Sequence, residues 1–227
     1  MQAVKKKLHL SPLQKMWKFE HSLWSQGARR VAGIDEAGRG PLSGPVVAAC
    51  CILSNDTLLD GVNDSKQLDE AQREALFDRI HQSPGVEFGV GIVEAAEIDR
   101  LNILGATFLA MHRALAQLES PPDLIIVDGS LAPSFGIPTL PIVKGDAQSA
   151  SIAAASILAK VTRDRIMLAL DEIYPQYGFR EHKGYGTPEH LAAIEKFGPC
   201  AIHRKSFEPI KGLLRTISQI DLFSDIH

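Results

Sequence analysis

The chain has 227 residues, of which 45% are hydrophobic and 22% charged, and its net charge is -3 at pH 7. This length suits one substantial core, and no apolar run approaches the roughly 18 residues that a membrane-spanning helix needs. Three cysteines, two of them adjacent, are too few for a disulfide framework. We therefore expect a soluble, cytoplasmic protein with reduced thiols.

The first 30 residues are expected to be an extension, largely helical. Leu13, Met16, Trp17 and Trp24 recur at helical spacing, which predicts a helix whose apolar face packs on the core. The two tryptophans could instead stack on nucleic-acid bases. Packing is favoured, because aromatic residues seven apart usually mark a buried helix face.

The next segment carries the strongest chemical signal. Residues 31–34 predict a short buried strand that ends in Asp35 and Glu36. Two adjacent carboxylates there need a counter-ion, and a hard divalent cation such as Mg²⁺ or Mn²⁺ supplies one. Since successive strand side chains point to opposite faces, both acids reach one site only if the strand ends or bulges there. An ordinary strand end followed by a turn is the alternative.

A turn of Gly38, Arg39 and Gly40 follows the two acids directly. The glycines permit close approach of the backbone to a ligand, and the arginine carries donors suited to phosphate and sugar oxygens. The combination of paired acids and this turn indicates chemistry on a phosphate.

Alternating apolar runs and helical patterns predict an α/β domain. Asp69 and Gln72 resemble a capping box that opens a helix through about residue 81, and Thr187 caps another helix. A helical stretch at 95–118 is broken near 102–105, and the longest helix is expected over 147–173. Strands are predicted over residues 31–35, 46–53, 87–93, 124–128 and 139–143.

Two later acids repeat the pattern of the first pair. Asp128 ends the apolar run 124–127, and Asp146 lies near the start of the longest predicted helix. Taken singly, Asp128 with the following glycine is usually a turn, and Asp146 is usually a helix cap that bonds the amide near Ser149. Together with the first pair, they supply about as many carboxylates as a two-metal site needs.

Four sequence blocks, in this order, resemble bacterial ribonuclease HII, the type 2 ribonuclease H. They are GIDEAGRGPLSGPV, IIVDG, KGDAxSxSIAAASIxAK and HKGYGT, and the resemblance runs from about residue 31 to 214. It implies a ribonuclease H-like fold, with a central mixed sheet flanked by helices and a small helical carboxyl-terminal region. The family's metal-binding, catalytic acids map onto Asp35, Glu36, Asp128 and Asp146.

The resemblance also implies how substrate is bound and cut. The family's glycine-arginine-glycine turn, which reads the ribonucleotide 2′-hydroxyl, maps onto Gly38, Arg39 and Gly40, and its sugar-packing tyrosine maps onto Tyr185. The implied enzyme uses Mn²⁺ or Mg²⁺ to cleave the RNA strand of RNA–DNA hybrids. It also nicks duplex DNA 5′ of an embedded ribonucleotide and leaves 5′-phosphate and 3′-hydroxyl ends. The sequence does not decide whether Asp146 is a direct ligand.

The distribution of charge points to the carboxyl-terminal third as the face for a nucleic-acid backbone. Residues 42–123 contain 5 Lys and Arg against 13 Asp and Glu, whereas residues 174–215 contain 7 against 4. Lys183, Arg204 and Lys205 are therefore the cations expected to meet phosphates, and Lys183 is included among the substrate-binding residues. Solvated surface charge is the alternative for each.

We expect a catalytic domain over residues 31–173, a helical substrate-binding region over 174–215 and a tail over 216–227, in a protein that acts as a monomer. The tail pentapeptide Gln219–Phe223 resembles the motif with which bacterial enzymes bind the DNA sliding clamp. A frayed terminus is the alternative.

The sequence disfavours three other functions. A type 3 ribonuclease H would need an extra amino-terminal domain, for which 30 residues leave no room. Acids at all four positions disfavour a non-catalytic hybrid-binding module. Tyr185 and the basic carboxyl-terminal region disfavour a metal-dependent phosphatase of small molecules.

Overall fold

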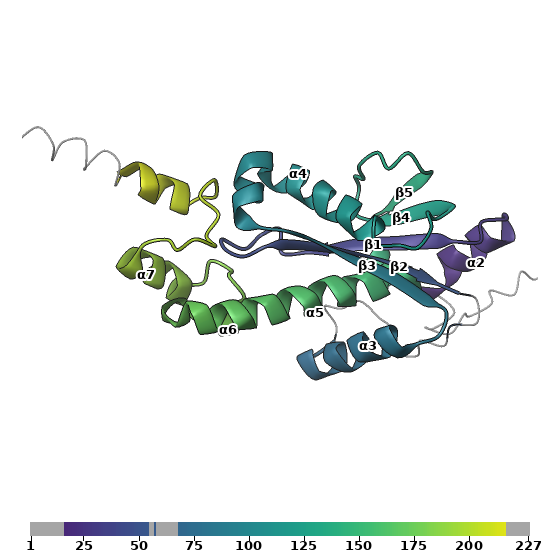
Figure 1. Ribbon diagram of the computed structural model, residues 1–227, viewed down its shortest axis with the longest axis horizontal. Helices are drawn as coiled ribbons and strands as arrows, with labels where there is room; N and C mark the ends of the chain where they lie inside the picture. The colour runs from purple at the N-terminus through teal and green to yellow at the C-terminus, as the bar shows by residue number, and fades with distance from the viewer. Residues whose placement is uncertain (1–15, 55–56, 58–67, 217–227) are drawn as a thin grey trace, which may run out of the picture.

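The computed structural model describes residues 16–54, 57 and 68–216. A single five-stranded sheet lies at the centre of these residues. Its strands are β1 (Val31–Ala37), β2 (Val46–Leu53), β3 (Val86–Val93), β4 (Leu124–Asp128) and β5 (Thr139–Ile142). Their order across the sheet is β3-β2-β1-β4-β5 (Figure 1). The pairs β1–β2 and β2–β3 are antiparallel, whereas β1–β4 and β4–β5 are parallel. The predicted central mixed sheet is therefore confirmed.

Helices cover both faces of this sheet. α3 (Glu70–Gln82) and α5 (Ala150–Ile173) lie on one face and α4 (Ala95–Leu115) on the other (Figure 1). Alternate residues of β2 enter the two cores, so Cys51 packs toward α5 and Cys50 toward α4. This is the period of two that an extended strand imposes on its side chains. All three cysteines are free thiols.

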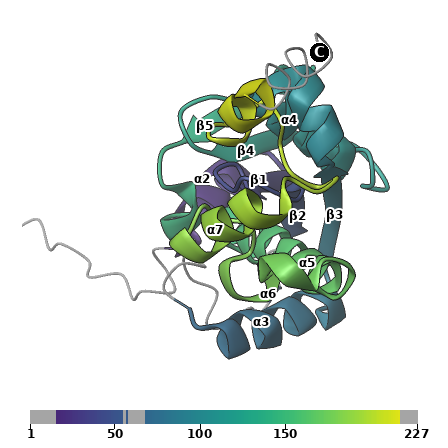
Figure 2. The same ribbon diagram turned by 90° about the vertical axis from the view of Figure 1, so that its left-hand side faces the viewer.

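The remaining elements lie at the two ends of the sheet (Figures 1 and 2). α2 (Lys18–Ser25) lies at one end, and the carboxyl-terminal elements lie at the other. These are η3 (Pro175–Tyr177), α6 (Phe179–His182), α7 (Pro188–Phe197) and a helical stretch over residues 210–216. A short 3₁₀ turn, η2 (Gly145–Ala147), precedes α5. Among the described helices, none has the length and apolar character that a bilayer crossing requires.

Local capping explains where most helices begin. The predicted capping box is present, since the Asp69 carboxylate accepts from the Gln72 amide and the Gln72 side chain bonds back. Thr187 caps α7, and Asn102 has non-helical dihedral angles inside α4, where a break was expected. The predicted start of the longest helix is three residues too early, because α5 begins at Ala150 and not at residue 147.

The start of α5 is fixed by side chains that the sequence did not single out. Ser149 caps the helix by accepting from the Ile152 amide, so Asp146 is not the helix cap. Glu20 of α2 is 1% exposed, and its carboxylate accepts from the hydroxyls of Ser149 and Ser151 at 2.5 and 2.6 Å. A buried carboxylate at a helix start is stabilised by the donors that the first turn leaves unpaired.

The extension packs on the core, as predicted. Met16 and Trp17 are buried in the cluster beneath α3 and α5, and Trp24 packs against it. This burial confirms a packing role for Trp17 over base stacking. Leu13 and the tail pentapeptide Gln219–Phe223 lie outside the described residues.

Candidate active site

Three carboxylates converge at one edge of the sheet. Asp35 lies near the end of β1, Asp128 ends β4 and Asp146 lies in η2. In the parallel register Ile34 stands beside Val127, so the following residues, Asp35 and Asp128, are neighbours. One carboxylate oxygen from each acid lies within 4.8 Å of the others. Parallel pairing thus brings together two acids that are 93 positions apart in the sequence.

The electrostatics of this cluster disfavour like charges without a counter-ion. Asp35 and Asp146 are 5% and 3% exposed. Burial raises the pKa of Asp35 well above its usual value, and the charges of Glu36 and Asp128 raise it further, while a hydrogen bond from Ser156 opposes them. Asp128 accepts from the Gly145 amide at 2.6 Å, which ties η2 to the end of β4.

Glu36 does not join this cluster. β1 keeps its register with β2 through Ala37, so the strand neither ends nor bulges between the two acids. The Glu36 carboxylate instead accepts from the Arg39 guanidinium at 3.2 Å. Both acids nevertheless line one recess with Asp128. Glu36 therefore links the acidic side of the recess to the turn that follows β1.

The same recess is lined by the glycine turn (Gly38, Arg39 and Gly40) and by Tyr185. Gly38 has φ +92°, a conformation that side chains disfavour, and a Cβ there would meet Arg163 at 2.1 Å. A Cβ on Gly40 would lie 3.7 Å from the Tyr185 ring. The tyrosine is 48% exposed, so its ring stands beside the turn with one part open to a ligand.

The Tyr185 loop is anchored by a chain of hydrogen bonds through two buried histidines. The Cys200 amide donates to His203 Nδ1 at 2.9 Å, so this nitrogen is the acceptor and Nε2 carries the proton. His203 Nε2 then donates to His190 Nε2 at 3.1 Å, and His190 Nδ1 donates to the Tyr185 carbonyl at 2.8 Å. The chain needs both imidazoles neutral, and burial lowers the pKa of each to about 4.

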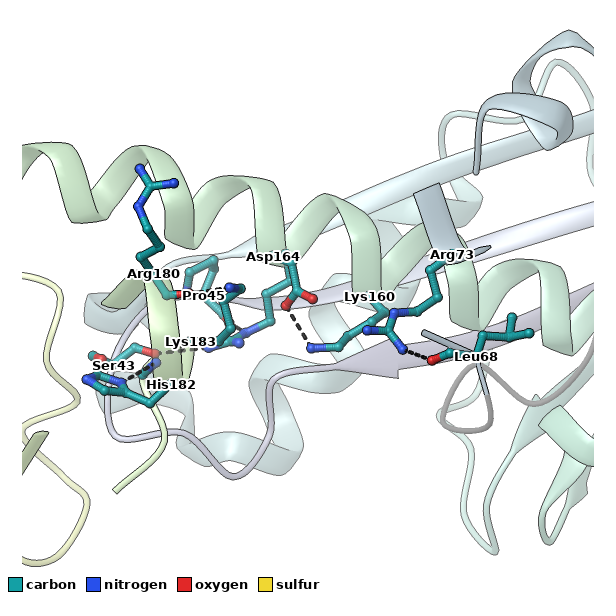
Figure 3. A network of polar contacts seen from close by, with 11 residues as sticks. Ser43, Pro45, Leu68, Arg73, Lys160, Asp164, Arg180, His182 and Lys183 are labelled. Carbon is teal, nitrogen blue, oxygen red and sulfur yellow. Dashed lines mark hydrogen bonds and ion pairs between the residues drawn. The ribbon is translucent and has the colours of Figure 1, made fainter. Parts of the chain in front are cut away.

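Several residues of the recess were not identified from the sequence. Ser156, Lys160 and Arg163 come from α5, and Arg73 comes from α3. The signal was their spacing, because residues i, i+4 and i+7 lie on one face of a helix. Figure 3 shows Lys160 bonded to Asp164 at 2.7 Å, with Arg73 beyond it bonded to the Leu68 carbonyl.

The three cations expected to meet phosphates have different environments. The prediction for Arg204 is wrong, because its side chain is 0% exposed and donates to backbone carbonyls. Counting charges along the sequence does not reveal burial. Lys205 is exposed, whereas Lys183 is partly buried, bonds the Arg180 carbonyl and does not line the recess.

A hard divalent cation fits the donors of the acidic cluster. Its three residues offer carboxylate oxygens from three separate elements, and two of them are buried. Oxygen donors of this kind suit Mg²⁺ and Mn²⁺, whereas softer metals prefer sulfur and imidazole. The raised pKa of Asp35 indicates a site whose ionised form is stabilised by added positive charge.

Comparison with known proteins agrees with this geometry. The family model described as Ribonuclease HII matches residues 32–210. The chain is 54% identical to Ribonuclease HII of Clostridioides difficile (strain 630) over 189 residues, which is 83% of this chain and 74% of that protein. It is 55% identical to Ribonuclease HII of Geobacillus thermodenitrificans (strain NG80-2) over 201 residues, covering 88% and 77%. The crystal structure of ribonuclease H2 from Pyrococcus horikoshii OT3 is 30% identical, with TM-score 0.67 and coverage of 81% and 96%.

Proposed function

We propose a specific activity for this chain, which belongs to the ribonuclease HII family and has a ribonuclease H-like fold. Members of this family are endonucleases that use a divalent metal ion to cleave RNA in RNA–DNA hybrids, and this chain is one of them. The enzyme nicks duplex DNA 5′ of an embedded ribonucleotide, leaving 5′-phosphate and 3′-hydroxyl ends. One observation carries the proposal: Asp35, Glu36 and Asp128 line the same recess as the glycine turn. A phosphodiester and the neighbouring ribose can therefore be held together.

We assign the metal-binding role to Asp35, Asp128 and Asp146, with Glu36 as a further catalytic acid at the same recess. When bound, Mg²⁺ or Mn²⁺ supplies the charge that activates water and stabilises the departing 3′-oxygen. The chain's own task is positioning and charge balance. Asp35 and Asp146 offer two buried carboxyl groups to the metal. Lys160 and Arg73, which line the recess, neutralise the phosphate.

We assign recognition of the ribonucleotide to the glycine turn and Tyr185. The amides of the turn and the Arg39 guanidinium offer donors to the 2′-hydroxyl and to neighbouring oxygens. The exposed part of the Tyr185 ring packs on the adjacent sugar. Lys183 serves as a more distant phosphate contact. In this assignment residues 31–173 carry catalysis and residues 174–215 bind substrate, within a monomer.

The experiment is cleavage of a duplex that carries one ribonucleotide, with Mg²⁺, with Mn²⁺ and with chelator. The wild-type enzyme should cut 5′ of the ribonucleotide, and end-labelling should reveal a 5′-phosphate and a 3′-hydroxyl. Asp35→Asn and Asp128→Asn should abolish cleavage while binding persists, since each removes a charge and keeps the shape. Retention of more than about a tenth of the rate, a barrier change under roughly 1.4 kcal/mol, would remove that residue from the metal site.

A separate proposal concerns the tail. Gln219–Phe223 would bind the DNA sliding clamp through its Leu-Phe pair, because two adjacent apolar side chains can be fully desolvated in a partner's pocket. This would bring a cytoplasmic enzyme to newly replicated DNA, where ribonucleotides are excised. A peptide of residues 216–227 should bind the clamp, and its Leu222→Ala, Phe223→Ala version should not. Equal binding by both peptides would refute the proposal, and cleavage of short duplexes should survive deletion of the tail.

A further inference from the structure

Arg204 is a fully buried cation whose partners are backbone carbonyls of the loop after β1. Its side chain is 0% exposed, and burial lowers its pKa to about 9, so it stays charged at neutral pH. The guanidinium donates to the carbonyl oxygens of Gly38 at 2.6 Å and Arg39 at 3.0 Å. It also donates to those of Gly44 at 3.1 Å and Pro45 at 3.2 Å. A buried charge is costly unless it is well bonded, and here the bonds converge on one loop.

These contacts fix the direction of two peptide groups. In a trans peptide the carbonyl and the next amide point in opposite directions. Because Arg204 holds the Gly38 and Arg39 carbonyls, the amides of Arg39 and Gly40 point away from it. The glycine turn itself lines the recess. Within the described part of the chain, neither amide donates to a backbone carbonyl.

The guanidinium is itself held rigidly by its own segment. The Arg204 amide donates to the Leu42 carbonyl at 2.8 Å, and the guanidinium lies 5.1 Å from the Phe207 ring centre. Asp99 of α4 accepts from the amides of Lys205 and Ser206 at 2.9 and 2.8 Å. The segment is therefore anchored on both sides of the arginine, which leaves the guanidinium little freedom.

We propose that Arg204 is a positioning residue for ribose recognition, which turns the Arg39 and Gly40 amides toward the 2′-hydroxyl and polarises them. A cation bound to a carbonyl strengthens the donor at the other end of the same peptide. The inference rests on the proposed role of the glycine turn. It adds that discrimination between ribose and deoxyribose depends on a residue that does not touch the sugar.

A second buried arginine, Arg163, supports the same loop without bonding the carbonyls of the glycine turn among the contacts described. Arg163 is 1% exposed and donates to the carbonyls of Ser43 and Pro45 at 3.1 and 3.0 Å. It braces the far arm of the same loop. Bracing of the loop is thus shared between two residues, whereas orientation of the two amides belongs to Arg204.

The test measures binding in an Asp35→Asn background, so that substrate is not consumed. Fluorescence anisotropy compares a duplex containing one ribonucleotide with the same duplex made entirely of DNA. The parent should prefer the ribonucleotide, and adding Arg204→Lys should reduce the preference about tenfold, the loss expected for one or two hydrogen bonds. Ile194→Ala is the control, because Ile194 is buried in the carboxyl-terminal cluster against which Phe207, the ring beside Arg204, also packs. It should keep the preference.

The outcomes separate this inference from the proposed function. If the parent shows no preference, the proposed ribose recognition fails. If the parent prefers the ribonucleotide and folded Arg204→Lys keeps the same preference, the role of Arg204 is refuted. Should Arg204→Lys fail to fold, Arg204→Ala is titrated with ethylguanidinium, which can occupy the vacated site. Recovery of folding and of the preference together supports the inference, and recovery of folding alone overturns it.

Discussion

Acidification from pH 7.5 to pH 5 should lower the stability of the folded protein through His190 and His203. Burial lowers the pKa of each imidazole to about 4, whereas an imidazole in the unfolded chain titrates near 6.5. Between these values the unfolded state binds more protons. The free energy of unfolding therefore falls as the pH drops below 6.5, and the stability is fully present above it. One imidazole accounts for about 2 kcal/mol at pH 5, and the pair for up to about 4 kcal/mol.

The hydrogen-bond chain gives the physical reason for this loss. Protonation of His203 Nδ1 would set a proton against the Cys200 amide that donates to it. Protonation of His190 Nε2 would set a proton against the donor on His203. His182 stacks on His190 at 4.4 Å between ring centres, and its charge also lowers the pKa of His190. Each proton therefore breaks one bond of the chain that ends at the Tyr185 carbonyl.

Urea unfolding at pH 7.5 and pH 5 measures the effect. The double variant His190→Gln, His203→Gln keeps donors and acceptors but does not titrate, so its stability should depend less on pH by about 2–4 kcal/mol. Asp35, whose raised pKa acts in the opposite direction, is common to both proteins and cancels. His21→Gln, at an exposed histidine, should behave like wild type. Equal losses in wild type and the double variant would refute the assignment.

Three further predictions follow from single contacts. Tyr185→Ala should weaken cleavage at single ribonucleotides far more than Tyr185→Phe, as measured by kcat/KM, because the ring supplies the contact area; equal losses would assign the role to the hydroxyl. Gly33→Ala should cost about 3 kcal/mol in urea unfolding, because a Cβ would lie 2.3 Å from the Ser151 backbone, while Gly105→Ala, whose nearest neighbour is 3.5 Å away, should cost little. Asp69→Ala should lower the free energy of unfolding in urea by about 1 kcal/mol through loss of the α3 cap. Asp69→Asn should keep most of that stability, because asparagine also caps helices.

Local patterns in the sequence were enough to predict the sheet and the acidic cluster. Each apolar run that ended in an acid became a strand, and parallel pairing of β1 with β4 placed Asp35 beside Asp128. Because the carboxyl ends of parallel strands share one edge of a sheet, such acids meet whatever connects them. The helix caps at Asp69 and Thr187 could also be predicted from the sequence, because the cap and the amide that it bonds are only three residues apart.

The contacts that the sequence did not reveal join distant segments. Arg204 resembles a surface cation in any count of charge, and its carbonyl partners lie 159 to 166 positions away. Every residue has a backbone carbonyl, so no sequence pattern indicates which carbonyls a buried guanidinium will bond. Glu36 lines the recess without joining the cluster of three aspartates, because β1 keeps its regular register with β2 through Ala37.

Contacts at the start and along the middle of α5 tie together the elements that carry the acids and the glycine turn. At the helix start, Glu20 binds Ser149 and Ser151, and the Ser149 amide donates to the Gly145 carbonyl beside Asp146. Further along the helix, Arg163 braces the loop that Arg204 also holds. A helix is stiff over this length, since each turn is bonded to the next. Segments near both termini of the chain therefore help to fix the acids relative to the glycine turn, although neither segment supplies an acid of the cluster.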